Sequence, residues 1–77
     1  MTSKRLALLI GKRSYPIVTS REEEVQRAAD LLRSVVESLD SSLSQDEMLF
    51  LAAMTLSGEL IRVEDRLREL AGGEEIP

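Results

Sequence analysis

The architecture of this chain follows from residues 44–71, which read SQDEMLFLAAMTLSGELIRVEDRLRELA and which we interpret as one long helix. Ser44 is a favoured N-cap, and Glu47 stands three residues later, where its carboxylate can bind the Ser44 amide in a capping box. Leu43 and Met48 occupy the positions of a hydrophobic staple around this cap. The start of the helix is therefore specified locally.

Apolar residues inside the stretch recur at alternating spacings of four and three, as the a and d positions of a heptad do. This seam consists of Leu49, Ala53, Leu56, Leu60, Val63, Leu67 and Leu70. Glycines follow at 72 and 73, and glycine commonly ends a helix. We predict a helix at 45–71, a tail at 72–77, and a homodimer formed along the seam, with the helices either parallel or antiparallel.

The two halves of this helix require different surroundings. Residues 48–54 are all apolar, so we expect them to be covered nearly all round. From Arg62 onward only the seam is apolar, and the other faces are charged. The helix should begin inside a globular head and leave it as a narrower rod.

Length and composition point to one small domain, residues 1–77, that gains stability by self-association. A chain of 77 residues buries a modest core and is marginal alone. Cysteine and histidine are absent, which excludes disulfides and makes a structural zinc site very unfavourable. We expect no cofactor.

The preceding residues predict a β-hairpin at 6–18. Leu6–Ile10 is an apolar strand, residues 11–14 form a four-residue turn, and Tyr15–Val18 returns. Pro16 has no N–H to donate, so its nitrogen should face outward or its strand should be an edge.

A first helix is expected at 20–40, with Thr19 or Ser20 as its N-cap and three glutamates in its first turn. The turn at Asp40–Ser42 is short, so the two helices should form an antiparallel hairpin. The predicted class is α+β: an N-terminal β-hairpin, then a helical hairpin whose long second helix extends as a short coiled coil.

Charge is distributed unevenly along the chain. Residues 1–21 contain five basic residues and no acid, whereas the remainder contains 14 acids and five arginines, leaving −9. This asymmetry either keeps a small protein soluble or marks a basic tip for an acidic partner. The hydrophobic run at Leu6–Ile10 is too short for a signal peptide or a membrane span, so we expect a cytoplasmic location.

The usual catalytic groups are missing. Without histidine or cysteine, the commonest general base and the thiolate nucleophile are absent. Gly11-Lys12 lacks the upstream glycine of a phosphate-binding loop. We therefore predict that the protein is not an enzyme.

Several segments together resemble the ZapA family of bacterial cell-division proteins. These are residues 43–44 followed by LAAMTLSGEL at 51–60, IGKRSYPI at 10–17, and AAD at 28–30. Met54 and Thr55 stand where the family usually has Leu-Asn. The resemblance extends over nearly the whole chain.

The resemblance implies a cytosolic dimer that binds the tubulin-like division protein FtsZ and cross-links its filaments at midcell. Carried over by position, the FtsZ-binding candidates are Lys12 or Arg13 in the hairpin turn and Asp46 or Glu47 at the start of the long helix. Alternatively, Lys12 and Arg13 are ordinary turn residues, and Glu47 is explained by capping. The family's long helix usually continues further and joins two dimers, so the short rod here predicts a dimer and at most a weak tetramer.

Two other functions fit parts of the pattern. A ribbon–helix–helix DNA-binding regulator also runs strand, helix, helix with a basic N-terminus, but its strand needs alternate polar residues, which Leu6–Ile10 lacks. A small oligomerisation module without a partner of its own is the third reading. We expect neither nucleic acid nor membrane as a partner.

Overall fold

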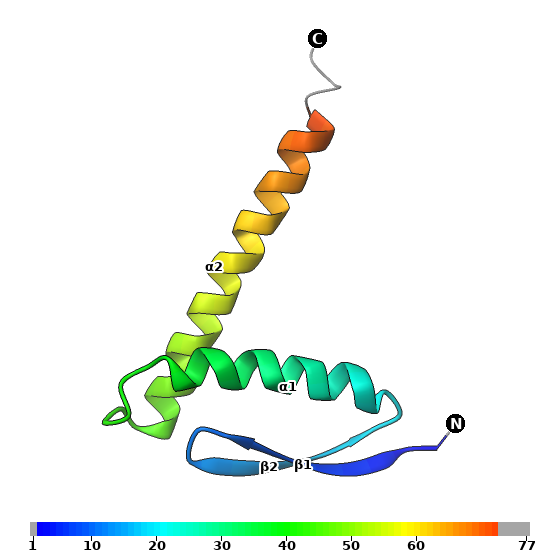
Figure 1. Ribbon diagram of the computed structural model, residues 1–77, viewed down its shortest axis with the longest axis vertical. Coiled ribbons are helices and arrows are strands. Elements are labelled where there is room, and N and C mark those ends of the chain that lie inside the picture. The colour runs from blue at the N-terminus through cyan, green and yellow to red at the C-terminus, as the bar shows by residue number, and fades with distance from the viewer. Residues whose placement is uncertain (1, 73–77) are drawn as a thin grey trace.

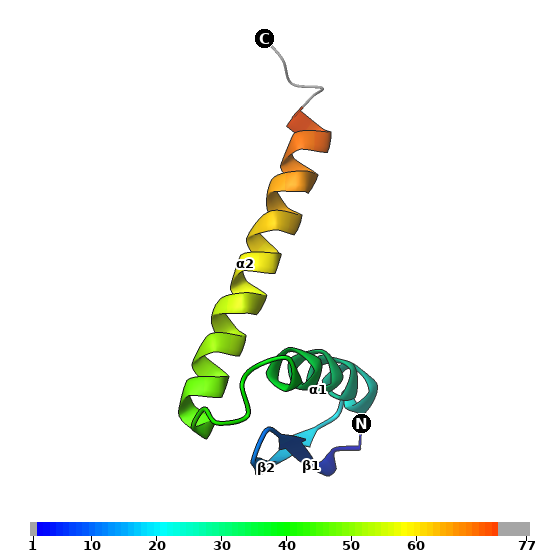
Figure 2. The same ribbon diagram turned by 60° about the vertical axis from the view of Figure 1, so that its left-hand side comes forward.

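The computed structural model describes residues 2–72 and has the element order β1 (Lys4–Ile10), β2 (Arg13–Thr19), α1 (Glu22–Glu37) and α2 (Gln45–Gly72) (Figure 1). The predicted α+β class and the order of elements are confirmed. The hairpin, α1 and the first turns of α2 form a head, and the rest of α2 projects from it as a rod (Figure 2). Gly72, predicted as the first residue of the tail at 72–77, is the last residue of α2, and residues 73–77 lie outside the described residues.

The two strands pair antiparallel around a two-residue loop. The register runs from Lys4 opposite Thr19 to Ile10 opposite Arg13, which leaves only Gly11 and Lys12 between the strands. The predicted four-residue turn is wrong, because glycine at the first loop position, here with φ of 63°, permits a tight turn whose twist matches that of the strands.

The first helix is shorter than predicted. Its N-cap is Arg21, not Thr19 or Ser20, and the cap makes no side-chain hydrogen bond. Thr19 Oγ1 instead accepts from the Arg21 N–H at 2.8 Å, which stabilises the turn out of β2 before the helix begins. At the other end, Ser38 N–H donates to the Val35 carbonyl at 3.1 Å, a three-residue closure that tightens the last turn.

The core lies where the hairpin, α1 and the start of α2 meet. It consists of Ile10, Ala29, Val36, Met48 and Ala52, all buried. Seven partly buried apolar side chains pack around this centre, drawn from all three parts of the head.

The two helices cross steeply and meet only where α1 ends and α2 begins (Figures 1 and 2). This differs from the expected antiparallel pairing. The reason is that α1 packs along the hairpin rather than along α2 (Figure 1), and Arg33 of α1 fixes this arrangement by donating from Nε to the Leu9 carbonyl at 2.8 Å.

The apolar segment 48–54 is covered on one side only. Met48 and Ala52 face the core, whereas Phe50 and Met54 point outward and are 63% and 57% exposed. The expectation that this segment is covered nearly all round is therefore not met within a single copy. In the described part of the chain, neither helix is long and apolar enough to cross a bilayer.

Candidate functional site

The start of α2 is built by reciprocal hydrogen bonds, and the predicted capping box is confirmed. The Ser44 N–H donates to Glu47 Oε1 at 2.9 Å, and the Glu47 N–H donates to Ser44 Oγ at 3.2 Å. The Ser44 N–H bond, and to a smaller extent the Ser44 side chain, lower the pKa of Glu47 below its ordinary value; nearby Lys12 adds a minor lowering. Glu47 is therefore held as a carboxylate at the first turn, where the helix dipole also favours negative charge.

Gln45 joins the hairpin turn to this helix start. Its Oε1 accepts from the Lys12 N–H at 2.7 Å. Its Nε2 donates to the Ile10 carbonyl at 2.7 Å and to the Tyr15 hydroxyl at 2.9 Å. One partly buried amide thus holds β1, the loop and β2 against α2.

Gly11 permits this close approach. A Cβ at residue 11 would lie 2.7 Å from Gln45 Oε1, which is a clash, and 3.3 Å from Met48 Sδ, which is a tight contact. The glycine is required both by its left-handed φ and by the contact between the hairpin turn and α2.

The FtsZ-binding candidates come together at this tip of the head. Lys12 lies against the loop before α2, since its Nζ donates to the Leu43 carbonyl at 2.7 Å. Arg13 is the next residue, and Asp46 and Glu47 stand on the adjoining helical turn; all four are exposed. Two segments more than thirty residues apart therefore present both signs of charge on one surface.

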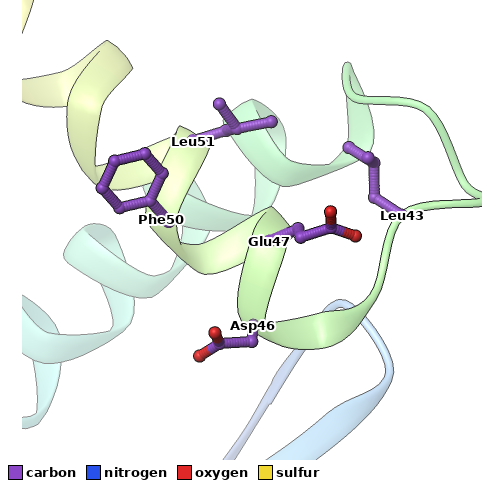
Figure 3. Close-up of a pocket in the computed structure, with 5 residues that line it drawn as sticks. All are labelled: Leu43, Asp46, Glu47, Phe50 and Leu51. Atoms are coloured by element: carbon purple, nitrogen blue, oxygen red, sulfur yellow. The ribbon is translucent and has the colours of Figure 1, made fainter.

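A shallow hollow of about 310 Å³ lies beside the acidic pair (Figure 3). It is lined by Leu43, Asp46, Glu47, Phe50 and Leu51. Leu43 comes from the loop, and the other four come from the first turns of α2 (Figure 3). Charged groups thus border an apolar hollow, a combination suited to binding a protein surface.

In the structure, the seam predicted as the dimer interface has half-buried residues in the head and exposed residues on the rod. Leu49 packs against the core and Leu56 is half-buried. Ala53 and the four seam residues of the rod are exposed, and those four, Leu60, Val63, Leu67 and Leu70, are between 54% and 70% exposed. A continuous apolar stripe therefore leaves the head, and the other residues of the described range 2–72 do not cover it.

Charged residues of the rod pair along the helix rather than forming a site. Glu59 binds Arg62 and Asp65 binds Arg68, each three residues apart and exposed. Among residues 2–72, no group of three or more acidic side chains is arranged to hold a metal ion. The described residues thus present binding surfaces and no assembled catalytic constellation.

Sequence reasoning did not find Gln45. A glutamine in the first turn of a helix is unremarkable by composition and spacing, and its partners lie 30 to 35 residues away. Only the docking of the hairpin reveals its role.

Comparison with known proteins gives one family. The family model described as "Cell division protein ZapA" matches residues 6–75, which include every element of the fold except the first two residues of β1. No curated protein and no solved structure matches the chain.

Proposed function

Because the chain belongs to the ZapA family of cell-division proteins, we propose that it is a Z-ring-associated adaptor that dimerises, binds FtsZ and promotes bundling of its filaments at midcell. It acts by binding alone, without catalysis. The observation that carries the proposal is the family match together with the uncovered seam on the rod, because bridging two filaments requires at least two copies of the head.

The exposed seam supports dimerisation on energetic grounds. Burying a leucine or valine side chain contributes roughly 1.5–3 kcal/mol relative to leaving it in water. Leu60, Val63, Leu67 and Leu70 are each more than half exposed in a single copy. Pairing two rods would cover all eight side chains, whereas surface ion pairs beside them contribute roughly 0–1 kcal/mol each.

The position of the charged candidates supports their role as the FtsZ contact. Lys12, Arg13, Asp46 and Glu47 lie at the tip where the hairpin turn meets α2, and the seam residues of the rod extend away from that tip. A dimer joined along the rod would leave both tips accessible. That geometry permits one dimer to hold two filaments.

Dimerisation is tested by measuring mass in solution across a range of concentrations. The double variant Leu60→Glu/Leu67→Glu should shift the protein to monomer, because it places charge inside the paired seam. The matched comparison is the single variant Leu60→Glu with Ile61→Glu, because each adds one charge at a similarly exposed apolar position, the first inside the seam and the second outside it. Equal effects of the two changes would contradict the assignment of the seam.

FtsZ binding is tested by co-sedimentation with polymerised FtsZ at low salt. We expect the wild type to enter the pellet and Lys12→Glu/Arg13→Glu to enter it much less while remaining dimeric. Arg27→Glu, a charge reversal at an exposed position of α1, serves as the control and should pellet like the wild type. No enrichment of the wild type would refute FtsZ binding, and unchanged pelleting of the double variant would refute the role of the hairpin turn.

Two features of the hairpin favour this function over a ribbon–helix–helix regulator. Each chain forms both strands of its own sheet, whereas that fold takes one strand from each of two chains. The face of the sheet turned away from the helices is mostly apolar, with Ala7, Leu9, Pro16 and Val18 exposed there. A mobility-shift assay at two salt concentrations should show no specific DNA complex.

A further inference from the structure

The hairpin has an uncovered face on the side away from α1 (Figure 1). Alternate residues of the two strands point there, and we call this surface the outer sheet face. It consists of Arg5, Ala7 and Leu9 on β1, opposite Val18, Pro16 and Ser14 on β2. Leu9 is 58% exposed and Val18 is 63% exposed. A two-stranded sheet that leaves such a face in water has area available for a partner.

The free edge of β1 offers backbone groups as well. The Leu9 carbonyl accepts from Arg33, so it points away from β2. Backbone groups alternate along an antiparallel strand, and those of Ala7 and Arg5 therefore point the same way as those of Leu9. The register agrees, because Ala7 lies opposite Pro16, which has no N–H to give to a ladder. Outside the sheet, no hydrogen bond among residues 2–72 engages the backbone of Arg5 or Ala7.

The edge of β2 is a poor template by comparison. Pro16 lies in the middle of that strand and removes the central outward N–H. An added strand therefore pairs better with β1, where no hydrogen bond outside the sheet among residues 2–72 engages the groups from Arg5 to the Leu9 N–H. Addition of an extended segment to an exposed sheet edge is a common mode of peptide recognition.

The basic charge around the hairpin indicates which kind of segment would bind the edge of β1. Residues 1–21 have a charge of +5 with no acid among them. Lys4 pairs with Glu22 at 3.3 Å, whereas none of the ion pairs within residues 2–72 involves Arg5, which lies on the outer sheet face. The hairpin itself, Lys4–Thr19, holds four of these basic residues, so a second copy would bring +4 against +4. This disfavours self-pairing, whereas an acidic segment would be attracted.

We propose that the free edge of β1 binds an extended acidic segment of another protein, which adds to the sheet as a third strand. Its backbone pairs with Arg5 and Ala7. Among its side chains on the outer sheet face, an apolar one lies beside Leu9 and a carboxylate lies beside Arg5, which is on the same face. None of the four FtsZ-binding candidates belongs to this surface, so the inference stands apart from the proposed function.

The test uses the full chain and a fluorescein-labelled octapeptide in which threonine alternates first with two valines and then with two glutamates, so that the valines and glutamates share one face of the strand. Binding is followed by fluorescence anisotropy. We expect saturable binding that weakens as salt is raised, and about tenfold weaker binding to Ala7→Pro, because loss of one or two backbone hydrogen bonds is of that order. Arg5→Glu should weaken binding as well. The matched control is Arg27→Glu, which leaves the hairpin unchanged.

A second probe leaves the protein untouched. The same peptide N-methylated at alternate residues keeps its charge and side chains but loses the N–H groups on one edge. Of the two alternate patterns, one should abolish binding and the other should not. Three results would each overturn the proposal. The first is equal binding of the two N-methylated peptides, and the second is equally tight binding of a peptide with lysine in place of glutamate. The third is a change in the mass of the protein in solution on Ala7→Pro, because it would mean that a second copy occupies the edge.

Discussion

Replacement of Gln45 by alanine should loosen the hairpin from the long helix. The amide makes three hydrogen bonds across this junction, to the Lys12 N–H, the Ile10 carbonyl and the Tyr15 hydroxyl, at 2.7, 2.7 and 2.9 Å. A net contribution of about 0.5–1.5 kcal/mol for each bond sets the scale. The Lys12 N–H is exposed and can bind water instead, so its bond should contribute at the low end. We expect Gln45→Ala to lower the free energy of unfolding by about 2–3 kcal/mol.

The assay is urea denaturation followed by circular dichroism. Each variant is measured at the same two protein concentrations, so that any contribution of dimerisation to the free energy of unfolding is compared on equal terms. Gln26→Ala is the matched control, since Gln26 is an exposed glutamine on α1 and its loss should change stability by less than about 0.5 kcal/mol. Tyr15→Phe removes one of the three hydrogen bonds, so its loss of unfolding free energy should lie between those of Gln26→Ala and Gln45→Ala. If Gln45→Ala were as stable as Gln26→Ala, the amide would not hold the junction and the reasoning would be refuted.

Three further outcomes follow from the same junction and from α2. Gly11→Ala should destabilise the fold by about 1–3 kcal/mol, because φ is positive there and the added Cβ would meet Gln45; thermal denaturation that shows no loss would contradict this. Gly58→Ala should instead stabilise the helix by about 0.5–1 kcal/mol, since the nearest atom to its Cβ would be 3.9 Å away; a lower melting temperature would show that a partner needs the space. Hydrogen bonds from Ser44 lower the pKa of Glu47, so its stabilising effect is present above the ordinary glutamate pKa and is lost as pH falls through the lowered folded value. Glu47→Gln should therefore flatten that acidic part of the stability profile, and unchanged pH dependence in denaturant titrations would count against the capping role.

The hydrophobic seam shows which features of the long helix its heptad spacing can predict and which it cannot. Its heptad spacing predicted a helix at 45–71, and the helix is found at Gln45–Gly72. The spacing alone does not separate Leu49, which packs against the chain's own core, from Leu67, which is exposed. Composition predicted that division, because residues 48–54 are apolar and the faces beside the seam are charged from Arg62 onward.

Errors at the other element boundaries have a common physical cause. Thr19 and Ser20 are both good N-caps by type, yet the helix begins after Arg21 because the turn out of β2 uses the Thr19 hydroxyl first. The hairpin loop is two residues long because Gly11 adopts a left-handed φ, a choice that the sequence permits but does not dictate. In each case a local alternative of similar quality was decided by the neighbouring element.

By itself the sequence determined the features that depend on contacts a few residues apart: the capping box of Ser44 and Glu47, the long helix, and the hairpin followed by two helices. Only the tertiary structure decided the steep crossing of the helices, the role of Gln45 and the meeting of the charged candidates at one tip. These features depend on groups that are 24 to 35 residues apart in the chain. The packing of the apolar faces brings such groups together, and their pairing produces no periodic pattern in the sequence.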